Sequence, residues 1–349
     1  TNPIGLTRRV GPAGIGGLFN IKPFSTMWKA LAGHFRDPRL RQLFGRYATY
    51  AGSSPYLAPA TLMLIAHVEQ EGVWLVKGGM HQLAVALAHV AERNGATIRY
   101  GAEVAEILTE RGRACAVRLA GGDGQRIDAD AVVLNADVSA PGNGLLGTQV
   151  VRAVPPTAPT DRSLSALTWN LAAKTSGFPL LRHSVFFSSD YPAEFDDIFQ
   201  HRRLPREPTV YICAQDRGAR CGSDAAGSAT QPDGPERLLL LVNAPAVGDT
   251  YQFHQDEIKQ CEARTLSLLQ RCGLHLECRP EAMRITTPNE FERLFPATGG
   301  ALYGRASHGW QASFSRPGSR SKVPGLYLAG GSTHPGAGVP MAALSGRQA

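Results

Sequence analysis

The end of the chain constrains the fold most, because a strand, a glycine-rich turn and a helix follow one another there. Leu326-Tyr-Leu-Ala329 is a short apolar run, and the turn from Gly330 to Gly338 contains four glycines. The helix expected from Val339 has a proline in its first turn, where proline is tolerated. Glycines let a bound ring or phosphate approach the backbone, and the free N–H groups of a helix start stabilise an anion. On spacing alone, this succession fits either a cofactor site or an ordinary tight connection.

An upstream segment predicts a strand of a parallel sheet. Ala131-Val-Val-Leu134 is a continuous apolar run, typical of a strand buried on both faces, and Asn135-Ala-Asp137 ends it. Apolar residues recur at helical spacing from Met80 to Ala91 and predict an amphipathic helix. Short β-rich runs between the helix and this strand predict a small β-meander: 97–100, 104–108 and 114–119.

The middle of the chain predicts a second domain with its own sheet. The expected strands are 164–171, 184–187, 210–213 and 238–242, and a helix is expected over 255–271. The segment from Asp216 to Glu236 lacks large apolar residues and reads as a long surface loop. The opening segment is mostly helical, with an apolar stripe that includes Met27, Leu31, Leu40 and Leu43. The pattern as a whole predicts a mixed α/β (α+β) protein.

Composition excludes several classes of function. The net charge of +7 comes from Lys and Arg residues spread along the 349-residue chain, without a nucleic-acid recognition motif, so no nucleic-acid partner is expected. The six cysteines form no CxxC pair, and no metal site is expected. The longest apolar stretches are too short to cross a bilayer, so we expect no membrane span.

Four sequence blocks, in order along the chain, resemble one family. They are Gly72-Val-Trp-Leu-Val-Lys-Gly-Gly-Met80, Val132-Val-Leu-Asn-Ala-Asp137, Gly299-Gly-Ala-Leu-Tyr-Gly304 with Arg316-Pro317 after it, and Gly325-Leu-Tyr-Leu-Ala-Gly-Gly-Ser-Thr-His-Pro-Gly-Ala-Gly-Val-Pro-Met341. They resemble the bacterial phytoene desaturase (carotenoid/retinoid oxidoreductase) family. Within it, His34 to Tyr47 and the terminal block look most like the hydroxyneurosporene, or 1-hydroxycarotenoid 3,4-, desaturases, also called methoxyneurosporene dehydrogenases.

The resemblance implies an FAD-dependent, amine-oxidase-like fold of two domains. The substrate domain would comprise the mostly helical, membrane-facing residues 1–76 and the mixed sheet of 141–296, and the FAD-binding domain would comprise 77–140 and 297–349. These residues contain no apolar strand followed by GxGxxG, and the glycine run Gly11 to Gly17 has the wrong spacing and reads as a loop or helix junction. The opening Rossmann βαβ unit is therefore expected to be absent from this chain, and the chain alone to be inactive.

The resemblance also implies a reaction and its cofactor. The expected function is desaturation of an acyclic carotenoid, most specifically 3,4-desaturation of a 1-hydroxycarotenoid, by hydride transfer to the N5 atom of FAD. The cofactor-binding candidates that it gives are Val104, Asp137, Gly330, Gly331, Ser332, Gly336, Gly338, Val339 and Met341. His308 and His334 are candidates for a catalytic base, and packing within loops explains each equally well.

The expected partners are the apolar carotenoid, a membrane surface, and a quinone or oxygen as electron acceptor. The expected location is the cytoplasmic side, in peripheral contact with the membrane. Phe24 to Tyr50, which carries Arg39, Arg41 and Arg46, is the candidate docking segment. Two alternatives stay open: another flavoenzyme such as a phytoene desaturase, carotenoid isomerase or amine oxidase, or an inactive fragment or pseudo-enzyme that binds an apolar ligand.

Overall fold

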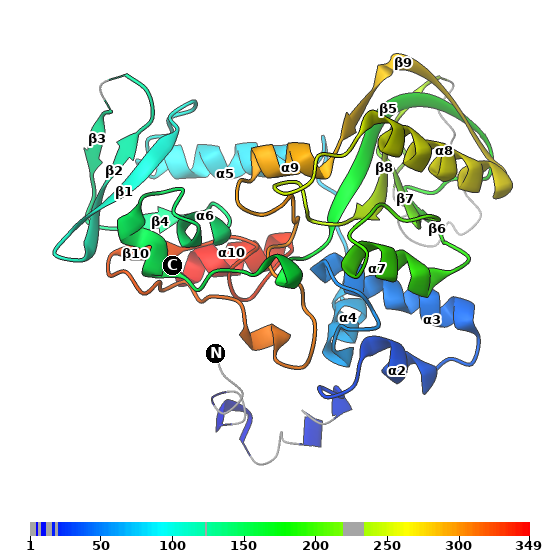
Figure 1. Ribbon diagram of the computed structural model, residues 1–349, viewed down its shortest axis with the longest axis horizontal. Helices are drawn as coiled ribbons and strands as arrows, with labels where there is room; N and C mark the ends of the chain where they lie inside the picture. The colour runs from blue at the N-terminus through cyan, green and yellow to red at the C-terminus, as the bar shows by residue number, and fades with distance from the viewer. Residues whose placement is uncertain (1–4, 6–7, 12–15, 18–19, 123, 219–233) are drawn as a thin grey trace.

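A computed structural model describes residues 5, 8–11, 16–17, 20–122, 124–218 and 234–349 (Figure 1). The glycine run Gly11 to Gly17 lies partly outside these residues, so its loop character stays a prediction. The predicted surface loop Asp216 to Glu236 is described only at its ends, where the prediction is wrong: Arg217 and Glu236 form a buried ion pair, and Glu236 already belongs to a strand. In the described part of the chain, no helix is both long and apolar enough to cross a membrane.

The described chain alternates helices with short and long strands. The α-helices and 3-10 helices are α2 (Met27–Ala32), α3 (Pro38–Gly45), η1 (Arg46–Ala51), η2 (Ala60–Met63), α4 (Leu64–Gln70), α5 (His81–Arg93), α6 (Ser139–Gly142), η3 (Thr148–Ala153), η4 (Pro159–Asp161), α7 (Tyr191–Phe199), α8 (Gln255–Arg271), α9 (Pro288–Leu294), η5 (Ala312–Phe314) and α10 (Val339–Gln348). The strands are β1 (Val104–Glu110), β2 (Arg113–Leu119), β3 (Arg126–Asp128), β4 (Val132–Leu134), β5 (Ser165–Gly177), β6 (His183–Phe186), β7 (Val210–Ala214), β8 (Glu236–Ala244), β9 (Leu274–Thr286) and β10 (Leu326–Leu328). The predicted mixed class is confirmed.

The largest sheet forms one end of the molecule (Figure 1). Its five strands run in the order β6-β7-β8-β5-β9, and every neighbouring pair is antiparallel. Alternate residues of β5 and β8, including Trp169 and Leu240, enter the core, and α8 adds Cys261 and Leu269. The sequence predicted four of these strands and the helix, but it missed β9. Polar residues in the middle of β9, from Glu277 to Glu281, hide its periodicity, and antiparallel pairing with Thr168 to Gly177 of β5 makes it a strand.

The other end of the molecule holds two small sheets. In one, β1 and β2 are two strands of the predicted meander and β3, which the sequence did not predict, is the third; in the other, β10 lies parallel to β4. Ile107 and Leu326 pack together between the two sheets. The predicted strand at 97–100 is wrong: these residues are not assigned to a strand. A strand needs a ladder of partners, and the meander begins only at Val104.

One face of this end is open, contrary to expectation. Val133, in the middle of β4, is 57% exposed, so the prediction that this strand is buried on both faces is wrong. The predicted amphipathic helix is present as α5, but none of its residues is buried. Leu87 and Val90 therefore lie in solvent, because no described element covers this helix stripe.

The opening helices pack against the large sheet's end of the molecule. Met27 and Leu31 are buried in a small core of their own, and Trp28 packs against Tyr56. Leu40 and Leu43, which the periodicity assigned to the inner stripe, are exposed. Helix α3 is short, and Gly45 is its only buried residue. Its apolar side chains therefore lie outside the part of the helix that contacts the rest of the protein.

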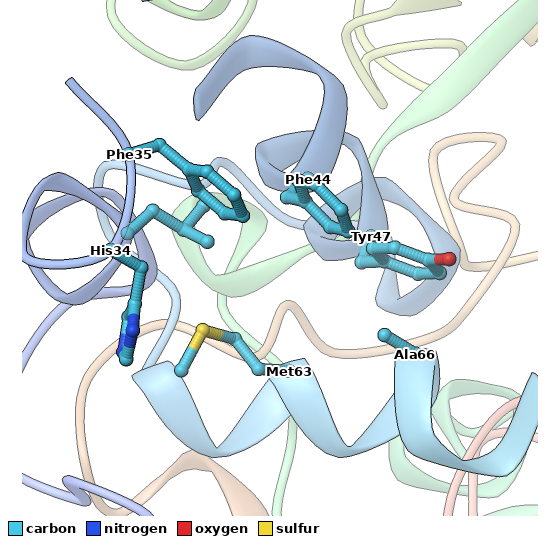
Figure 2. A pocket seen from close by; sticks show the side chains of 7 residues that line it. His34, Phe35, Phe44, Tyr47, Met63 and Ala66 are labelled. Atoms are coloured by element: carbon cyan, nitrogen blue, oxygen red, sulfur yellow. The ribbon is translucent and has the colours of Figure 1, made fainter. Parts of the chain in front are cut away.

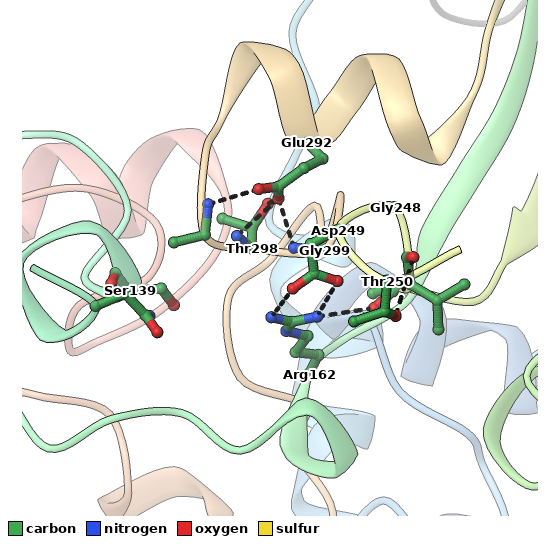
Figure 3. Close-up of polar contacts among 12 residues, drawn as sticks. Ser139, Arg162, Gly248, Asp249, Thr250, Glu292, Thr298 and Gly299 are labelled. Atoms are coloured by element: carbon green, nitrogen blue, oxygen red, sulfur yellow. Dashed lines mark hydrogen bonds and ion pairs between the residues drawn. The ribbon is translucent and has the colours of Figure 1, made fainter. Parts of the chain in front are cut away.

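Residues 299–304 run from the large sheet's end of the molecule to the terminal turn. Arg162 forms an ion pair with Asp249, at 2.6 Å between Nη2 and Oδ2, and Glu292 accepts hydrogen bonds from the backbone of residues 297–299 (Figure 3). Gly299 has a φ of 65°, and a Cβ there would lie 2.2 Å from Arg162 Nη1 and 2.4 Å from the Ala246 oxygen. The position accepts only glycine.

Gly299→Ala is therefore expected to destabilise the protein by more than about 2 kcal/mol, since strained backbone and steric overlap combine. The measurement is urea unfolding. Gly309→Ala is the matched control, because Gly309 has a φ of 75° but open space around a Cβ. It should cost about 1 kcal/mol, and an equal loss in the two variants would refute the steric argument.

Candidate functional site

The candidate site lies where two parallel strands end. Leu326 to Leu328 pair in register with Val132 to Leu134, so the turns after β4 and β10 emerge at the same edge. The Asn135 Nδ2 atom donates to the Ala329 oxygen at 3.1 Å and ties the two strand ends together. A Cβ on Gly330, which has a φ of 120°, would lie 2.9 Å from that Nδ2 atom. Glycine is thus required at the first position of the turn.

Hydroxyl groups hold the turn against α10. The Gly330 N–H donates to Ser345 Oγ at 2.7 Å, and Thr333 Oγ1 donates to the Gly330 oxygen at 2.6 Å. Ser345 is also the only residue of α10 that is buried. The helix is therefore fixed on one side at the turn, and most of its surface is free.

Asp137 and Ser332, two cofactor-binding candidates, come together at this edge. Ser332 Oγ accepts a hydrogen bond from the Val138 N–H at 3.1 Å, and Asp137 Oδ1 accepts one from the Ser139 N–H at 2.8 Å. A Cβ on Gly304 would lie 2.8 Å from Ser332 Cβ and 3.4 Å from Asp137 Oδ2. The structure thus brings three of the four sequence blocks into one site.

Arg316 is the functional residue that sequence reasoning missed. Its Nη1 atom donates to the Tyr303 oxygen at 2.8 Å and to the Gly331 oxygen at 3.1 Å, and its Nη2 atom donates to the Arg305 oxygen at 2.8 Å. Burial lowers the pKa of Arg316, and the nearby Asp137 carboxyl opposes that shift. The sequence carried only one signal, the position of Arg316 before a proline in a family block.

The start of α10 leaves room for a ligand. Gly338 caps the helix with a φ of 110° and supplies no side-chain hydrogen bond, and a Cβ on it would meet nothing within 4 Å. Val339 is exposed and Met341 is half-buried beside it. Gly336, with a φ of 133°, lies over Arg316, whose Nε atom would be 3.4 Å from an added Cβ. An uncapped helix start, glycine backbone and a buried cation fit an electron-rich, anionic group such as a flavin.

Two candidates contribute differently from the others. The Gly331 carbonyl oxygen accepts a hydrogen bond from Arg316, so the backbone of Gly331 stabilises the turn itself. Val104 begins β1 and pairs with Leu119 in the meander. Its predicted role in cofactor binding stays a prediction, as do the ligand-binding roles of the other candidates.

His308 lies away from the terminal turn, in contact with the opening segment. Its Nε2 atom accepts a hydrogen bond from the Ser54 N–H at 3.2 Å, and its ring packs edge-on against Phe199. Burial lowers the pKa of His308 to about 4, so the ring is neutral near pH 7. This geometry favours loop packing over a catalytic base, because the available lone pair is already engaged.

His334 lies within the turn itself. The backbone N–H of His334 donates to the Pro317 backbone oxygen at 2.7 Å. Burial lowers the pKa of its imidazole, and the Arg316 cation adds to that shift. The ring is therefore neutral near pH 7, and its role as a base stays a prediction.

Two apolar cavities lie at the opening helices, one among those helices and the other between them and the segment around β6. One of about 420 Å³ is lined by Leu31, His34, Phe35, Phe44, Tyr47, Met63 and Ala66 (Figure 2). The other, of about 320 Å³, is lined by Leu43, Phe44, Arg46, Tyr47, Tyr50, Val185 and Phe187. Phe44 and Tyr47 line both, so the two cavities adjoin at these rings. Their lining suits a long apolar ligand.

Sequence comparison agrees with a flavin site. Residues 23–170 and 186–349 match the family described as flavin containing amine oxidoreductase. A hydroxyneurosporene desaturase from Rubrivivax gelatinosus is 58% identical over 340 residues, which is 97% of this chain and 63% of that protein. A 1-hydroxycarotenoid 3,4-desaturase from Flavobacterium sp. (strain P99-3) is 34% identical over 316 residues, 90% of this chain and 62% of that protein. The chain thus spans less than two thirds of the length of these curated relatives.

Structural comparison agrees on the fold. The crystal structure of an oxidoreductase from Methanosarcina mazei matches with a TM-score of 0.55 at 19% identity, over 92% of this chain and 66% of that one. The predicted amine-oxidase-like fold class is confirmed. The predicted domain boundaries stay predictions, although both small sheets and the large sheet fall inside their expected ranges.

Proposed function

Because the chain belongs to the family of flavin containing amine oxidoreductases, we propose that it acts in FAD-dependent desaturation of an acyclic carotenoid, in carotenoid biosynthesis. The specific reaction that we propose is 3,4-desaturation of a 1-hydroxycarotenoid. FAD is the cofactor of the family. The observation that carries the proposal is the terminal turn, in which Gly330, Gly338 and Arg316 present glycine backbone, a helix start and a cation at one sheet edge.

The relatives support the choice of substrate. The two proteins described above are named for desaturation of hydroxylated carotenoids, and the first of them matches almost the whole of this chain. The apolar cavities beside Phe44 and Tyr47 suit a polyene, because aromatic and aliphatic side chains make up most of their walls.

The residues of this chain bind and orient rather than react. When bound, FAD supplies the oxidising power that side chains lack. Gly338 and Val339 would offer the N–H groups of the α10 start, and Arg316 would keep the turn in place through three backbone oxygens. The apolar walls would exclude water from the polyene, which protects a reactive species from hydration.

The test uses the protein at its full natural length, loaded with FAD. A 1-hydroxycarotenoid in lipid vesicles should yield a product with a longer conjugated system, visible as a red-shifted absorption band, when a soluble quinone or oxygen is supplied. Parallel anaerobic and aerobic assays would identify the acceptor. Failure to retain flavin, or failure to convert the hydroxylated substrate, would refute the proposal.

Another carotenoid substrate is the second candidate. A phytoene desaturase would use the same turn and the same cavities. The structure of the site therefore favours neither phytoene nor a hydroxylated carotenoid as the substrate. Conversion of phytoene but not of the hydroxylated carotenoid would support it, and apolar-ligand binding without any turnover would support the pseudo-enzyme alternative.

We also propose that the protein docks peripherally on the cytoplasmic membrane surface, where its substrate resides. Phe24, Leu40, Leu43 and Tyr50 are exposed apolar residues of the opening segment. Three exposed cations accompany them: Lys29, Arg36 and Arg39, the last of which forms an ion pair with Asp37 at 2.7 Å between Nη2 and Oδ2. Arg41 and Arg46, which the sequence assigned to the same face, are not exposed cations: Arg41 lies half-buried over the Trp28 ring, and Arg46 is buried in a cavity wall.

Charge reversal at Lys29, Arg36 and Arg39 to Glu is expected to weaken binding to anionic vesicles by at least about tenfold, because each cation near the surface contributes attraction. Vesicle flotation at low and high salt measures this. The matched control reverses three exposed cations on the large sheet's end of the molecule: Lys174, Arg264 and Arg279. Equal loss in both triple variants would point to net charge rather than to a docking face.

A further inference from the structure

Arg46 is a buried cation without an ion-pair partner. Arg46 is the first residue of η1 and is 8% exposed. The Nε and Nη1 atoms of its side chain make no hydrogen bond in the described structure. The described residues provide no carboxylate within ion-pair distance of it. A buried guanidinium with unused donors is costly. We therefore expect a ligand to accept hydrogen bonds from those donors.

The surroundings of Arg46 are suited to a mostly apolar ligand. It is the one charged side chain among the residues that line the cavity of about 320 Å³, and Phe44, Tyr47 and Phe187 supply aromatic walls. The neighbouring cavity of about 420 Å³ continues beyond Phe44 and Tyr47. A long apolar chain could therefore lie against these rings while one polar atom meets the cation.

Arg46 is also connected to the terminal turn. Burial raises the pKa of the Tyr303 phenol, and the Arg46 cation opposes that shift, so the two side chains lie near each other. The Tyr303 backbone oxygen accepts a hydrogen bond from Arg316, which also donates to the Gly331 oxygen. Tyr303 is thus near both arginines, Arg46 acting on its side chain and Arg316 on its backbone oxygen.

The buried Tyr191 phenol lies beside the Arg46 guanidinium, which opposes the rise in pKa that burial causes there, but neither the Tyr191 oxygen nor the Arg46 Nε and Nη1 atoms make a hydrogen bond in the described structure. The charge of Arg46 acts on three phenols and one carboxyl: Tyr50, Tyr191, Tyr211 and Glu194. Glu194 is fully buried, but its oxygens already accept from Thr209 and Asn243, and burial raises its pKa. The nearest carboxyl is therefore engaged elsewhere.

We propose that Arg46 is the specificity-determining residue for the oxygenated end of the substrate, where its N–H groups donate to the hydroxyl oxygen of a 1-hydroxycarotenoid. This inference rests on the proposed function. The hydroxyl and the bond to be desaturated are only a few bonds apart, so a group that binds the hydroxyl must lie close to the flavin turn. A site built to bind a hydroxyl discriminates strongly against the analogue without one, because its donors would stay buried and unpaired.

The test is the ratio of kcat/KM for a 1-hydroxycarotenoid to that for the same carotenoid without the hydroxyl, measured on the full-length, FAD-loaded protein. Arg46→Met should lower this ratio by roughly 10- to 100-fold, the range that one charge-assisted hydrogen bond represents. Arg46→Lys keeps a donor and should retain part of the preference. Arg264→Met, at an exposed site on α8, should leave the ratio unchanged.

The outcomes separate the two proposals. A wild-type protein that does not convert the hydroxylated substrate refutes the proposed function itself. A wild-type preference that survives in Arg46→Met, or equal losses on both substrates, refutes only the role of Arg46. Should Arg46→Met be insoluble, Arg46→Gln and Arg46→Lys provide the same comparison, and a ratio unchanged in both overturns the inference.

Discussion

Gly338→Val in the full-length, FAD-loaded protein is expected to lose flavin and desaturase activity together while the protein stays soluble. The φ of 110° at Gly338 is a conformation that a β-branched residue rarely adopts, so the backbone must rotate and redirect the start of α10. An added Cβ meets nothing within the chain, so the damage should be confined to the helix start and to the space in front of it.

The measurements are flavin absorbance after gel filtration and product formation. Gly121→Val is the matched control, since Gly121 has a φ of 77° and an equally open Cβ position in the turn between β2 and β3. It should cost stability without losing flavin. His334→Gln should retain flavin and lower turnover only modestly, because the backbone of His334 makes the contact with Pro317. Lost solubility in Gly338→Val would instead indicate a purely structural turn.

Arg316→Met is expected to destabilise the protein by about 3 kcal/mol or more and to release flavin. The substitution leaves three backbone oxygens without their donor, those of Tyr303, Arg305 and Gly331, and each unsatisfied buried acceptor costs roughly 1–3 kcal/mol. Urea unfolding and flavin absorbance measure the two effects.

Arg316→Lys separates charge from geometry. Lysine keeps the cation near Asp137 but lacks the planar fork that reaches three oxygens, so we expect an intermediate stability. Arg320→Met is the control at an exposed arginine four residues away. An Arg316→Met protein with unchanged unfolding and full flavin would contradict the assigned role.

Local sequence was enough to identify the terminal turn. Gly330, Gly336 and Gly338 all adopt positive φ, and Pro340 lies in the first turn of α10, so each residue type reports a backbone conformation that depends on that residue alone. The apolar runs of β4 and β10 also predicted strands, whereas the parallel register between them is known only from the structure.

Burial was less predictable, because it depends on what the chain packs against. Periodicity placed Leu40 and Leu43 in a core and predicted that β4 is covered on both faces, yet both leucines and Val133 are exposed. A hydrophobic pattern shows which face of an element can be buried, and only the tertiary structure shows whether a partner is present.

The sequence by itself determined the strand, turn and helix of the candidate site, because glycine and proline act on their own backbone. Only the tertiary structure assigned Arg316 to the turn, Arg46 to a cavity and His308 to a contact with Ser54. Each of these side chains meets a partner that is distant or unpatterned in the sequence. An arginine or histidine has no periodicity that distinguishes a solvated charge from a buried donor, so its role depends on the packing that surrounds it.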